Sequence, residues 1–162
     1  MKIIVLSDTH IPSSCNDIDP EIYKELKKCD FVIHAGDVVE MQFLKKLAGL
    51  AELKAVHGNM DSADIKNKFP EKIVFTAGSK KIGVVHGYGP RRTILAAVND
   101  AFKKDKPDII IFGHSHEVYN QQMNGTLYFN PGSPTDLLAP KRSFGIIDID
   151  NSDITPRIIY LS

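Results

Sequence analysis

The chain has 162 residues, 43% of them hydrophobic, and its 20 basic and 20 acidic residues give a formal net charge of zero. This length predicts a single domain over residues 1–162, with enough apolar residues to bury a core. The balanced charge argues against binding to extended nucleic acid, which needs a basic face, and no apolar run approaches the roughly 20 residues of a membrane-spanning helix.

Five short apolar runs predict five strands, and turn residues follow each of them. The runs cover residues 3–6, 31–33, 53–56, 82–85 and 109–112. Short runs rich in β-branched residues are typical of strands that are buried on both faces. We therefore expect these strands to lie at the centre of the fold.

Four helices are expected between the strands. Asp19-Pro20 is a typical helix start, with a capping side chain followed by proline at the first helical position. The second helix is predicted over 41–50, and a weaker one over 62–69. Gly89-Pro90 opens the fourth helix, where four apolar residues share one face: Ile94, Val98, Ala101 and Phe102.

Hairpins replace the alternation of strand and helix in the last third of the chain. Asn124-Gly125 is a strong turn signal between two strand-like runs. Two further hairpins are predicted around residues 77–79 and 151–153. Parallel strand–helix units combined with hairpins predict an α/β fold in which two mixed sheets pack face to face with helices outside. The crossovers of the parallel units should be right-handed.

Side chains that bind metals follow every one of the predicted strands. The seven candidates are Asp8, His10, Asp37, Asn59, His86, His114 and His116. The carboxyl ends of strands in an open α/β sheet form its binding edge, so we expect these side chains to converge. Within Asp8-Thr9-His10 and His114-Ser115-His116 the ligands are two residues apart, which on an extended strand end points both side chains to the same side.

More than one ion is expected at this point. A carboxylate has two oxygens and can join two cations, and Asp37 is the candidate for that bridge. Two ions about 3.5–4 Å apart are a standard device for in-line phosphoryl displacement. Mixed imidazole, carboxylate and amide ligands favour Mn, Fe, Ni, Zn or Co over Ca or Mg. Because two divalent ions would keep a residual positive charge, an anionic phosphate ester is the expected substrate.

The ordered motifs resemble those of the calcineurin-like metallophosphoesterases. They are Asp8-x-His10, Gly36-Asp37, Gly58-Asn59, His86-Gly87 and Gly113-His114-x-His116. The compact length and the segment Asn130-Pro131-Gly132-Ser133 are similar to the small single-domain phosphodiesterase branch of that superfamily. The resemblance spans most of the chain and implies the family's four-layer α/β sandwich, with Asn130 to Ser133 forming a loop that shapes the site.

The resemblance also implies that the ligands divide between two divalent transition-metal ions. Manganese is the metal that we expect at both sites. The first ion would be held by Asp8, His10, Asp37 and His116, and the second by Asp37, Asn59, His86 and His114. A water or hydroxide that bridges the ions would attack phosphorus, so Asp37, Asn59 and His86 are the candidate catalytic residues. We expect a cytoplasmic enzyme that hydrolyses small phosphodiesters. Its edge strands offer a surface through which two copies could pair into a homo-oligomer.

One position departs from the family pattern. Many members carry a histidine directly after the motif asparagine, where it protonates the leaving oxygen, but here that residue is Met60. The small branch commonly lacks this histidine too. The general acid is therefore unassigned, and we hypothesise that the enzyme prefers leaving groups that need little protonation, such as phenolates, or uses bound water.

Several other polar residues have two interpretations each. Asp61 either supports a ligand or caps the following helix. His34 is expected to be a core histidine bonded to backbone, His57 a packed or surface residue, and Asp136 a loop residue. The pairs Arg91-Arg92 and Lys141-Arg142 are either phosphate clamps or solvated positions. The two cysteines, Cys15 and Cys29, are expected to be reduced thiols.

Two other functions compete with a small-molecule phosphodiesterase. Some relatives of this fold, such as the retromer scaffold subunit, act through protein contacts and have a degraded metal site. Every expected ligand type is present in this chain, which favours an enzyme. A nuclease-like enzyme would share the same centre, but a basic groove or an added capping domain would be expected with it, and the sequence favours neither.

Overall fold

The computed structural model describes residues 1–139 and 141–162. Ten strands form two five-stranded sheets, ordered β10-β9-β1-β2-β3 and β4-β5-β6-β8-β7. The first sheet contains β1 (Lys2–Leu6), β2 (Phe31–His34), β3 (Glu52–Ala55), β9 (Ser143–Asp150) and β10 (Asp153–Tyr160). The second contains β4 (Lys72–Ala77), β5 (Lys80–Val85), β6 (Ile109–Ile111), β7 (Val118–Met123) and β8 (Thr126–Pro131).

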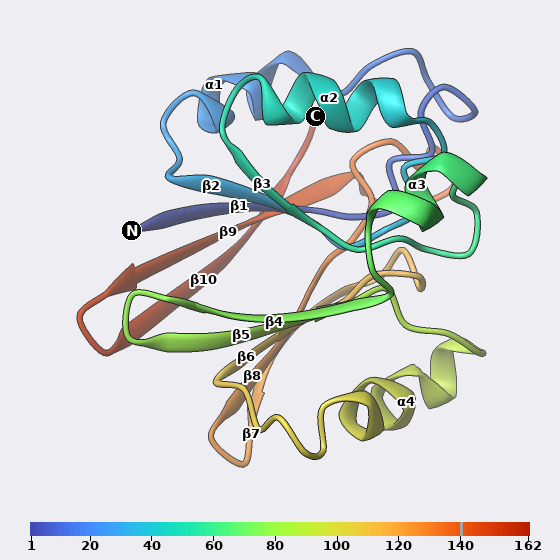
Figure 1. Cartoon of the computed structure of the whole chain (residues 1–162). Helices are drawn as coiled ribbons and strands as arrows, with labels where there is room; N and C mark the ends of the chain where they lie inside the picture. Colours follow the sequence, from blue (N-terminus) through green and yellow to red (C-terminus); the bar gives the residue numbers. More distant parts are fainter. Residues whose placement is uncertain (140) are drawn as a thin grey trace.

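Three of the four described helices cover the outer faces of the two sheets, and α3 (Ala63–Lys68) lies at their edge (Figure 1). The three are α1 (Pro20–Leu26), α2 (Met41–Ala48) and α4 (Ile94–Ala101), with a 3-10 turn, η1 (Arg91–Thr93), before α4. Helices α1 and α2 lie over the first sheet and α4 lies over the second, so the layers run helix, sheet, sheet, helix (Figure 1). The predicted four-layer α/β sandwich is confirmed.

The alternation of side chains along the strands builds this layering. In β1, Ile3 and Val5 lie in the apolar layer between the two sheets, whereas Ile4 and Leu6 pack in the cluster under α1 and α2. All four side chains are fully buried, and each contributes about 1.5–3 kcal/mol of hydrophobic stabilisation. A third cluster, which includes Val98 of α4, packs on the outside of the second sheet.

Strand pairing agrees with the predicted mixture. Strands β1, β2 and β3 are parallel, as are β5, β6 and β8, and the three hairpins are antiparallel. The prediction that the run 53–56 is buried on both faces is wrong, because β3 is an edge strand on which Leu53 and Lys54 are only half-buried. Two helices are shorter than expected, since α2 ends at Ala48 and the turn Arg91–Thr93 delays α4 until Ile94.

None of the described helices is both long enough and apolar enough to cross a membrane. Cys15 and Cys29 are free thiols, as expected. At the N-terminus of α1, Asp19 Oδ1 accepts a hydrogen bond of 2.9 Å from the backbone N–H of Glu21. This capping bond confirms the helix start that the sequence predicted.

Candidate metal centre

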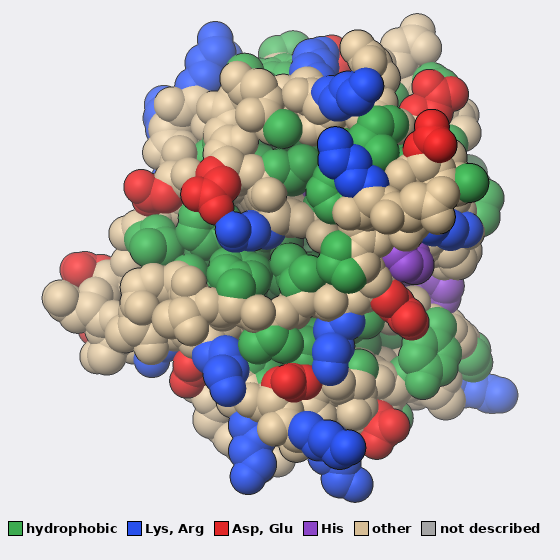
Figure 2. Space-filling model, in the orientation of Figure 1, with side chains coloured by type: hydrophobic (Ala, Val, Ile, Leu, Met, Phe, Trp, Pro, Cys, Tyr) green, Lys and Arg blue, Asp and Glu red, His purple; other side chains and the backbone are tan. Residues whose placement is uncertain are grey.

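The candidate ligands lie where the carboxyl ends of the two sheets meet. Asp8 follows β1 and Asp37 follows β2 in the first sheet, whereas His86 and His114 follow β5 and β6 in the second. The backbone N–H of His114 donates to Asp8 Oδ2 at 3.0 Å, which ties the two edges together. Histidine side chains reach the surface at this edge, on the right of Figure 2.

The backbone at these positions is left-handed rather than extended. Positive φ angles occur at five of the seven candidates: Asp8 (54°), His10 (46°), Asp37 (56°), His114 (67°) and His116 (57°). Such angles are uncommon outside glycine and cost about 1–3 kcal/mol each, and they cluster at functional sites. The expectation that the paired ligands sit on extended strand ends is therefore wrong. Left-handed backbone at both ligands of each pair sets the direction of their side chains.

Asp8, His10 and His116 form the first group of potential ligand atoms, all within 4.8 Å of one another. His116 Nε2 lies 3.4 Å from Asp8 Oδ1 and 3.2 Å from His10 Nε2. Two imidazole nitrogens and a carboxylate oxygen that face one point are a donor set for a divalent transition metal. The grouping matches three of the four ligands expected for the first ion.

Asp8, Asp37 and His86 form the second group. His86 Nε2 lies 3.2 Å from Asp37 Oδ2 and 3.9 Å from Asp8 Oδ1. Asp37 Oδ2 is also 3.9 Å from His10 Nε2, so this oxygen faces a histidine of each group. That position suits the bridge expected of Asp37. The structure adds that Asp8 belongs to both groups, which the sequence did not predict.

Asn59 and His114 lie beside the second group. Asn59 Oδ1 is 3.2 Å from His114 Nδ1, and the ring centroid of His114 is 5.2 Å from that of His86. His114 Nε2 is 3.0 Å from the carbonyl oxygen of Gly89. Within the described residues, His114 is in neither of the two carboxylate-containing groups. The structure thus places Asn59 and His114 next to each other and the ring of His114 beside that of His86.

His86 provides the most direct indication that an ion fits this centre. Its Nδ1 donates to the carbonyl oxygen of Ala35 at 2.8 Å, so Nε2 carries the free lone pair. In the described part of the chain, this buried Nε2 makes no hydrogen bond of acceptable geometry, although Asp37 Oδ2 lies 3.2 Å away. A buried polar atom without a partner is costly, and a cation between Nε2 and the two carboxylates would satisfy it. The residues therefore fit divalent metal ions.

Negative charge dominates the electrostatics of the centre. Burial lowers the pKa of His86, but Asp37 and Asp8 outweigh burial, so the pKa is raised overall. Hydrogen bonding to Asp8 and the charge of Asp136 raise the pKa of His116 to about 9. Burial raises the pKa of Asp37, but His86 and the N–H of Met60 more than reverse this, so its pKa is lowered. Ionised Asp37 therefore attracts cations.

Asp136 has a role that sequence reasoning missed. Its Oδ2 lies 2.7 Å from His116 Nδ1, which leaves Nε2 of His116 to face Asp8. A carboxylate behind a ligating imidazole fixes the tautomer and the orientation of the ring. The interpretation of Asp136 as a plain loop residue is therefore incomplete. No spacing pattern links it to His116, because the contact depends on how the loop after β8 folds back.

Asp61 supports the centre rather than capping a helix. Its carboxylate accepts four backbone N–H bonds: from Asp37 (3.0 Å), Val38 (2.6 Å), Val39 (2.7 Å) and Gly58 (2.7 Å). The residue before α3 is Ser62, so Asp61 is not its cap. Val39 has a φ of 89°, an outlier for a β-branched residue. Asp61 thus holds the loops of Asp37 and Asn59 in strained conformations.

The segment Asn130 to Ser133 braces the ligand loops, as expected of a shaping loop. Asn130 Nδ2 donates to the carbonyl oxygen of Gly113 at 2.9 Å, directly before His114. Ser133 Oγ donates to the carbonyl oxygen of Asp8 at 2.7 Å. A further bond runs from Thr135 Oγ1 to the carbonyl oxygen of Thr9. These bonds hold the loop after β1 against the loop after β6.

The other polar residues fall outside the centre. His57 is half-buried, with Nδ1 3.4 Å from the carbonyl oxygen of Gly58. Arg91 pairs with Glu117 on the surface, which supports its interpretation as a solvated position. Arg142 donates to the backbone of Ser162, also on the surface. His34 is fully buried, accepts from the N–H of Gly36 at 3.2 Å and confirms the predicted core histidine.

His34 makes the metal-free protein sensitive to acid. Burial lowers its pKa from 6.5 to about 4. Between pH 6.5 and pH 4, His34 is therefore protonated in the unfolded chain but not in the folded chain. Stability is therefore full above pH 6.5 and is lost towards pH 4. We expect His34→Gln to weaken this loss by about 3 kcal/mol, measured by urea unfolding across the range. Parallel curves for both proteins would contradict the assignment.

Gly113 leaves no room for a side chain beside Asp8. A Cβ at this position would collide with Ser7 Oγ and lie 2.6 Å from Asp8 Oδ2. We expect Gly113→Ala to lower the free energy of unfolding by about 1–3 kcal/mol and to displace the Asp8 carboxylate. Urea unfolding and Mn²⁺ titration measure the two effects. Gly49→Ala is the matched control, because its Cβ would meet no atom closer than 3.4 Å. Equal effects of both substitutions would argue against close packing at Gly113.

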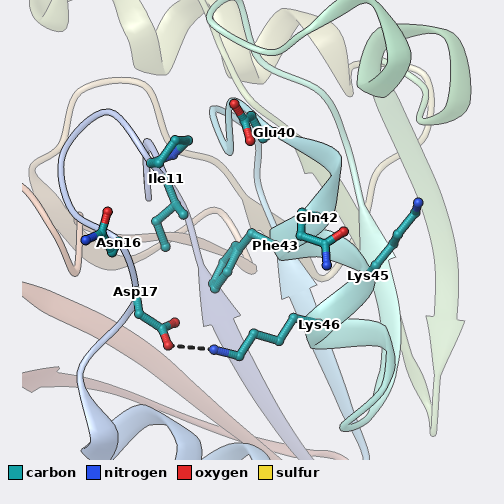
Figure 3. Close-up of a pocket in the computed structure, with 9 residues that line it drawn as sticks. Ile11, Asn16, Asp17, Glu40, Gln42, Phe43, Lys45 and Lys46 are labelled. Carbon is teal, nitrogen blue, oxygen red and sulfur yellow. Dashed lines mark hydrogen bonds and ion pairs between the residues drawn. The ribbon is translucent and has the colours of Figure 1, made fainter.

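A large cavity lies behind the loop that carries His10 (Figure 3). Its volume is about 540 Å³, and its walls include Ile11 and Asp17 of the loop and Phe43 and Lys46 of α2. Lys46 Nζ and Asp17 Oδ2 form an ion pair of 2.5 Å across one side. Among its described lining residues there is no candidate metal ligand, so this cavity is separate from the centre.

Comparison with curated proteins supports the same family. The chain is 33% identical over 153 residues to a probable metallophosphoesterase of Methanocaldococcus jannaschii, covering 93% of this chain and 77% of that protein. It is 30% identical over 169 residues to a probable metallophosphoesterase of Bacillus subtilis, covering 97% of this chain and 89% of the relative.

Solved structures share the fold over almost the whole chain. A protein of Thermotoga maritima, solved by NMR, has a TM-score of 0.78 at 30% identity and covers 99% of each chain. A structure described as a novel archaeal phosphodiesterase has a TM-score of 0.74 at 27% identity, covering 98% of this chain and 100% of that one. Vps29 of Chaetomium thermophilum has a TM-score of 0.81 at 22% identity, and the match covers 99% of this chain and 96% of the Vps29 chain. At this identity the similarity shows only that the two proteins share a fold.

The family model for the calcineurin-like phosphoesterase superfamily domain matches residues 1–152. That range includes all seven candidate ligands, among them Asp8, whose carboxylate the two groups share. The chain belongs to the calcineurin-like phosphoesterase superfamily.

Proposed function

We propose that the protein is a dinuclear metal-dependent phosphodiesterase that acts on small phosphodiesters. The observation that carries the proposal is the pair of adjoining ligand groups, Asp8–His10–His116 and Asp8–Asp37–His86, which share a carboxylate. Adjoining groups with a common carboxylate suit two ions held close together. Asn59 and His114, next to His86, would complete the second site.

The protein's own residues prepare the centre for this chemistry. When bound, two divalent ions supply positive charge for the phosphoryl oxygens and lower the pKa of an attacking water. Ala35 holds His86 with Nε2 inward, and Asp136 does the same for His116. Asp37 stays ionised because its pKa is lowered. The chain thus fixes donor atoms before substrate arrives, which avoids reorganisation during the reaction.

Met60 supports a preference for good leaving groups. It follows Asn59 directly, is 57% exposed and has no proton to donate. We therefore expect efficient hydrolysis of aryl diesters, whose phenolate leaves without protonation, and slow hydrolysis of alkyl diesters. A series of methyl aryl phosphates with phenols of graded pKa tests this expectation. A rate that does not change across the series would contradict it.

The proposal of a diesterase is tested by removing and restoring the metal. Protein stripped by a chelator should not hydrolyse bis(p-nitrophenyl) phosphate. We expect added Mn²⁺ to restore turnover. The rate should differ when Ni²⁺, Fe²⁺, Zn²⁺ or Co²⁺ is added instead, because the coordination geometry and the ligand types of a site favour some metals over others. p-Nitrophenyl phosphate serves as the monoester comparison and should be hydrolysed more slowly. A folded, metal-loaded protein that leaves the diester intact would contradict the proposal.

A protein-interaction scaffold is the second candidate, favoured by the similarity in fold to Vps29. A scaffold does not need a complete set of ligands, whereas this chain retains seven. The enzyme is therefore the stronger proposal. The zero net charge argues for small substrates over extended nucleic acid. The two free thiols suit a cytoplasmic location, and homo-oligomers through the edge strands stay a prediction.

A further inference from the structure

A lysine lines the cavity that opens beside the second ligand group. The cavity has a volume of about 190 Å³, and two candidate ligands, Asn59 and His86, form part of its wall. Other side chains that line it include His57, Glu71 and, from α3, Lys66. Among the described lining residues, Lys66 is the only lysine or arginine. A negatively charged group that enters this cavity would therefore meet the ammonium group of Lys66.

The ammonium group of Lys66 is anchored next to a candidate ligand. Its Nζ donates a hydrogen bond of 2.8 Å to the carbonyl oxygen of Asn59, which belongs to the peptide bond between Asn59 and Met60. Five other lysines form ion pairs with carboxylates, but within the described residues Lys66 forms none. The protein thus holds this positive charge at the edge of the metal centre and gives it no carboxylate partner.

Hydrolysis of a phosphodiester places negative charge on one particular atom. The oxygen of an attacking water forms a bond to phosphorus, and the water passes a proton to solvent. The bond from phosphorus to the leaving oxygen breaks, and its electron pair stays on that oxygen. In-line displacement puts the leaving oxygen opposite the attacking water. Asp8 and Asp37 close the inner side of the centre, at 0% and 3% exposed. The leaving group must therefore depart through an open side, such as the cavity at Lys66.

A second cavity borders the first ligand group, but its lysine contacts a different group. This cavity has a volume of about 580 Å³, and both His116 and Lys141 line it. Lys141 Nζ lies 5.4 Å from the ring centroid of Tyr160, which places its charge against an aromatic ring rather than against a candidate ligand. Of these two lysines, Lys66 is therefore the one whose charge lies next to the centre.

We infer that Lys66 is a catalytic residue that stabilises the negative charge on the leaving oxygen. The inference rests on the proposed function, since it assigns a role in the hydrolysis of a diester. Met60 has no proton to give to this oxygen, so stabilisation of charge takes the place of proton transfer. A positive charge that is already in position lowers the barrier without reorganisation during the reaction. The effect is largest for basic leaving oxygens, because these carry the least stable negative charge.

Hydrolysis of the methyl aryl phosphates by the Mn²⁺-loaded protein tests the inference. Lys66→Gln removes the charge but keeps an N–H donor for the carbonyl oxygen of Asn59. We expect this variant to lower kcat by about 100-fold for methyl phenyl phosphate but by less than about tenfold for methyl p-nitrophenyl phosphate, as for the loss of one donor that stabilises developing charge. Lys66→Arg keeps the charge and should restore the wild-type dependence on the leaving group.

Lys68→Gln is the matched control, because it removes the same charge from an exposed position in the last turn of the same helix. Its rates should equal those of the wild type for every ester. Thermal unfolding and Mn²⁺ content verify that each variant is folded and loaded. A lysine that only holds the loop of Asn59 in place would lower the rates of all esters by one common factor.

Three results would each overturn the inference. Lys66→Gln could change the rates of all esters by the same factor or leave them unchanged. Lys66→Arg could behave like Lys66→Gln, or Lys68→Gln could make the rates as dependent on the leaving group as Lys66→Gln does. Failure of the wild-type, metal-loaded protein to hydrolyse any of these diesters would instead overturn the proposed function.

Discussion

Asp37→Asn is expected to lower the rate of hydrolysis of bis(p-nitrophenyl) phosphate by more than about 100-fold. Loss of a residue that only hydrogen-bonds a metal ligand already lowers activity by up to about 100-fold, and Asp37 is expected to be a ligand itself. Asp37 is 3% exposed, and its Oδ2 faces His10 and His86, which belong to the two ligand groups. Asparagine keeps the size of the side chain and an oxygen for the N–H of Met60. It removes the negative charge that two cations would share, so metal binding should fall while the fold stays intact.

Steady-state kinetics, metal content and thermal unfolding measure these three effects together. Asp153→Asn is the matched control, because it makes the same change of charge at an exposed position at the start of β10. The control should retain wild-type activity. His114→Ala should also abolish turnover, through loss of a ligand in the second site. Full activity of a folded Asp37→Asn protein would remove the assignment of Asp37 as the bridging ligand.

Asp61→Ala is expected to destabilise the protein by about 4 kcal/mol. The carboxylate accepts four backbone N–H bonds of 2.6–3.0 Å at a position that is 4% exposed. Alanine would leave these donors without a partner, and each buried unsatisfied group costs about 1–3 kcal/mol before the loops relax. For a chain of this length, the change corresponds to a lower melting temperature by about 10 °C.

Thermal and urea unfolding measure the loss, and Asp61→Asn, which keeps one acceptor oxygen, should fall between wild type and alanine. Asp64→Ala, at an exposed position in the first turn of α3, is the control and should change stability by less than about 0.5 kcal/mol. If Asp61→Ala were as stable as Asp64→Ala, the four bonds would not be what holds the loops. Asp61 would then have no supporting role.

The sequence predicts the layers of this fold because the pattern of its apolar residues is local. Runs such as 3–6 and 109–112 identify strands, and Asn124-Gly125 identifies a hairpin turn. Which strands become neighbours is not local. Strand β9 pairs with β1 from the other end of the chain, and β8 pairs with β6 in parallel. The exposure of β3 follows from its edge position, which its sequence alone does not reveal.

The identity of the candidate ligands is also readable from the sequence, whereas their geometry is not. Asp8 and His10 were expected on extended backbone, yet both have left-handed φ angles. Bonds between distant segments stabilise these conformations, such as that from Ser133 Oγ to the carbonyl oxygen of Asp8. Asp136 reaches His116 through the fold of a loop. Contacts between distant segments leave no spacing pattern in the sequence.

Anomalous diffraction from crystals grown with Mn²⁺ tests the central claim most directly. The account predicts two peaks about 3.5–4 Å apart, one next to Asp8, His10 and His116 and the other next to His86 and Asn59, with Asp37 contacting both. A single peak, or peaks at sites that these side chains do not line, would contradict it.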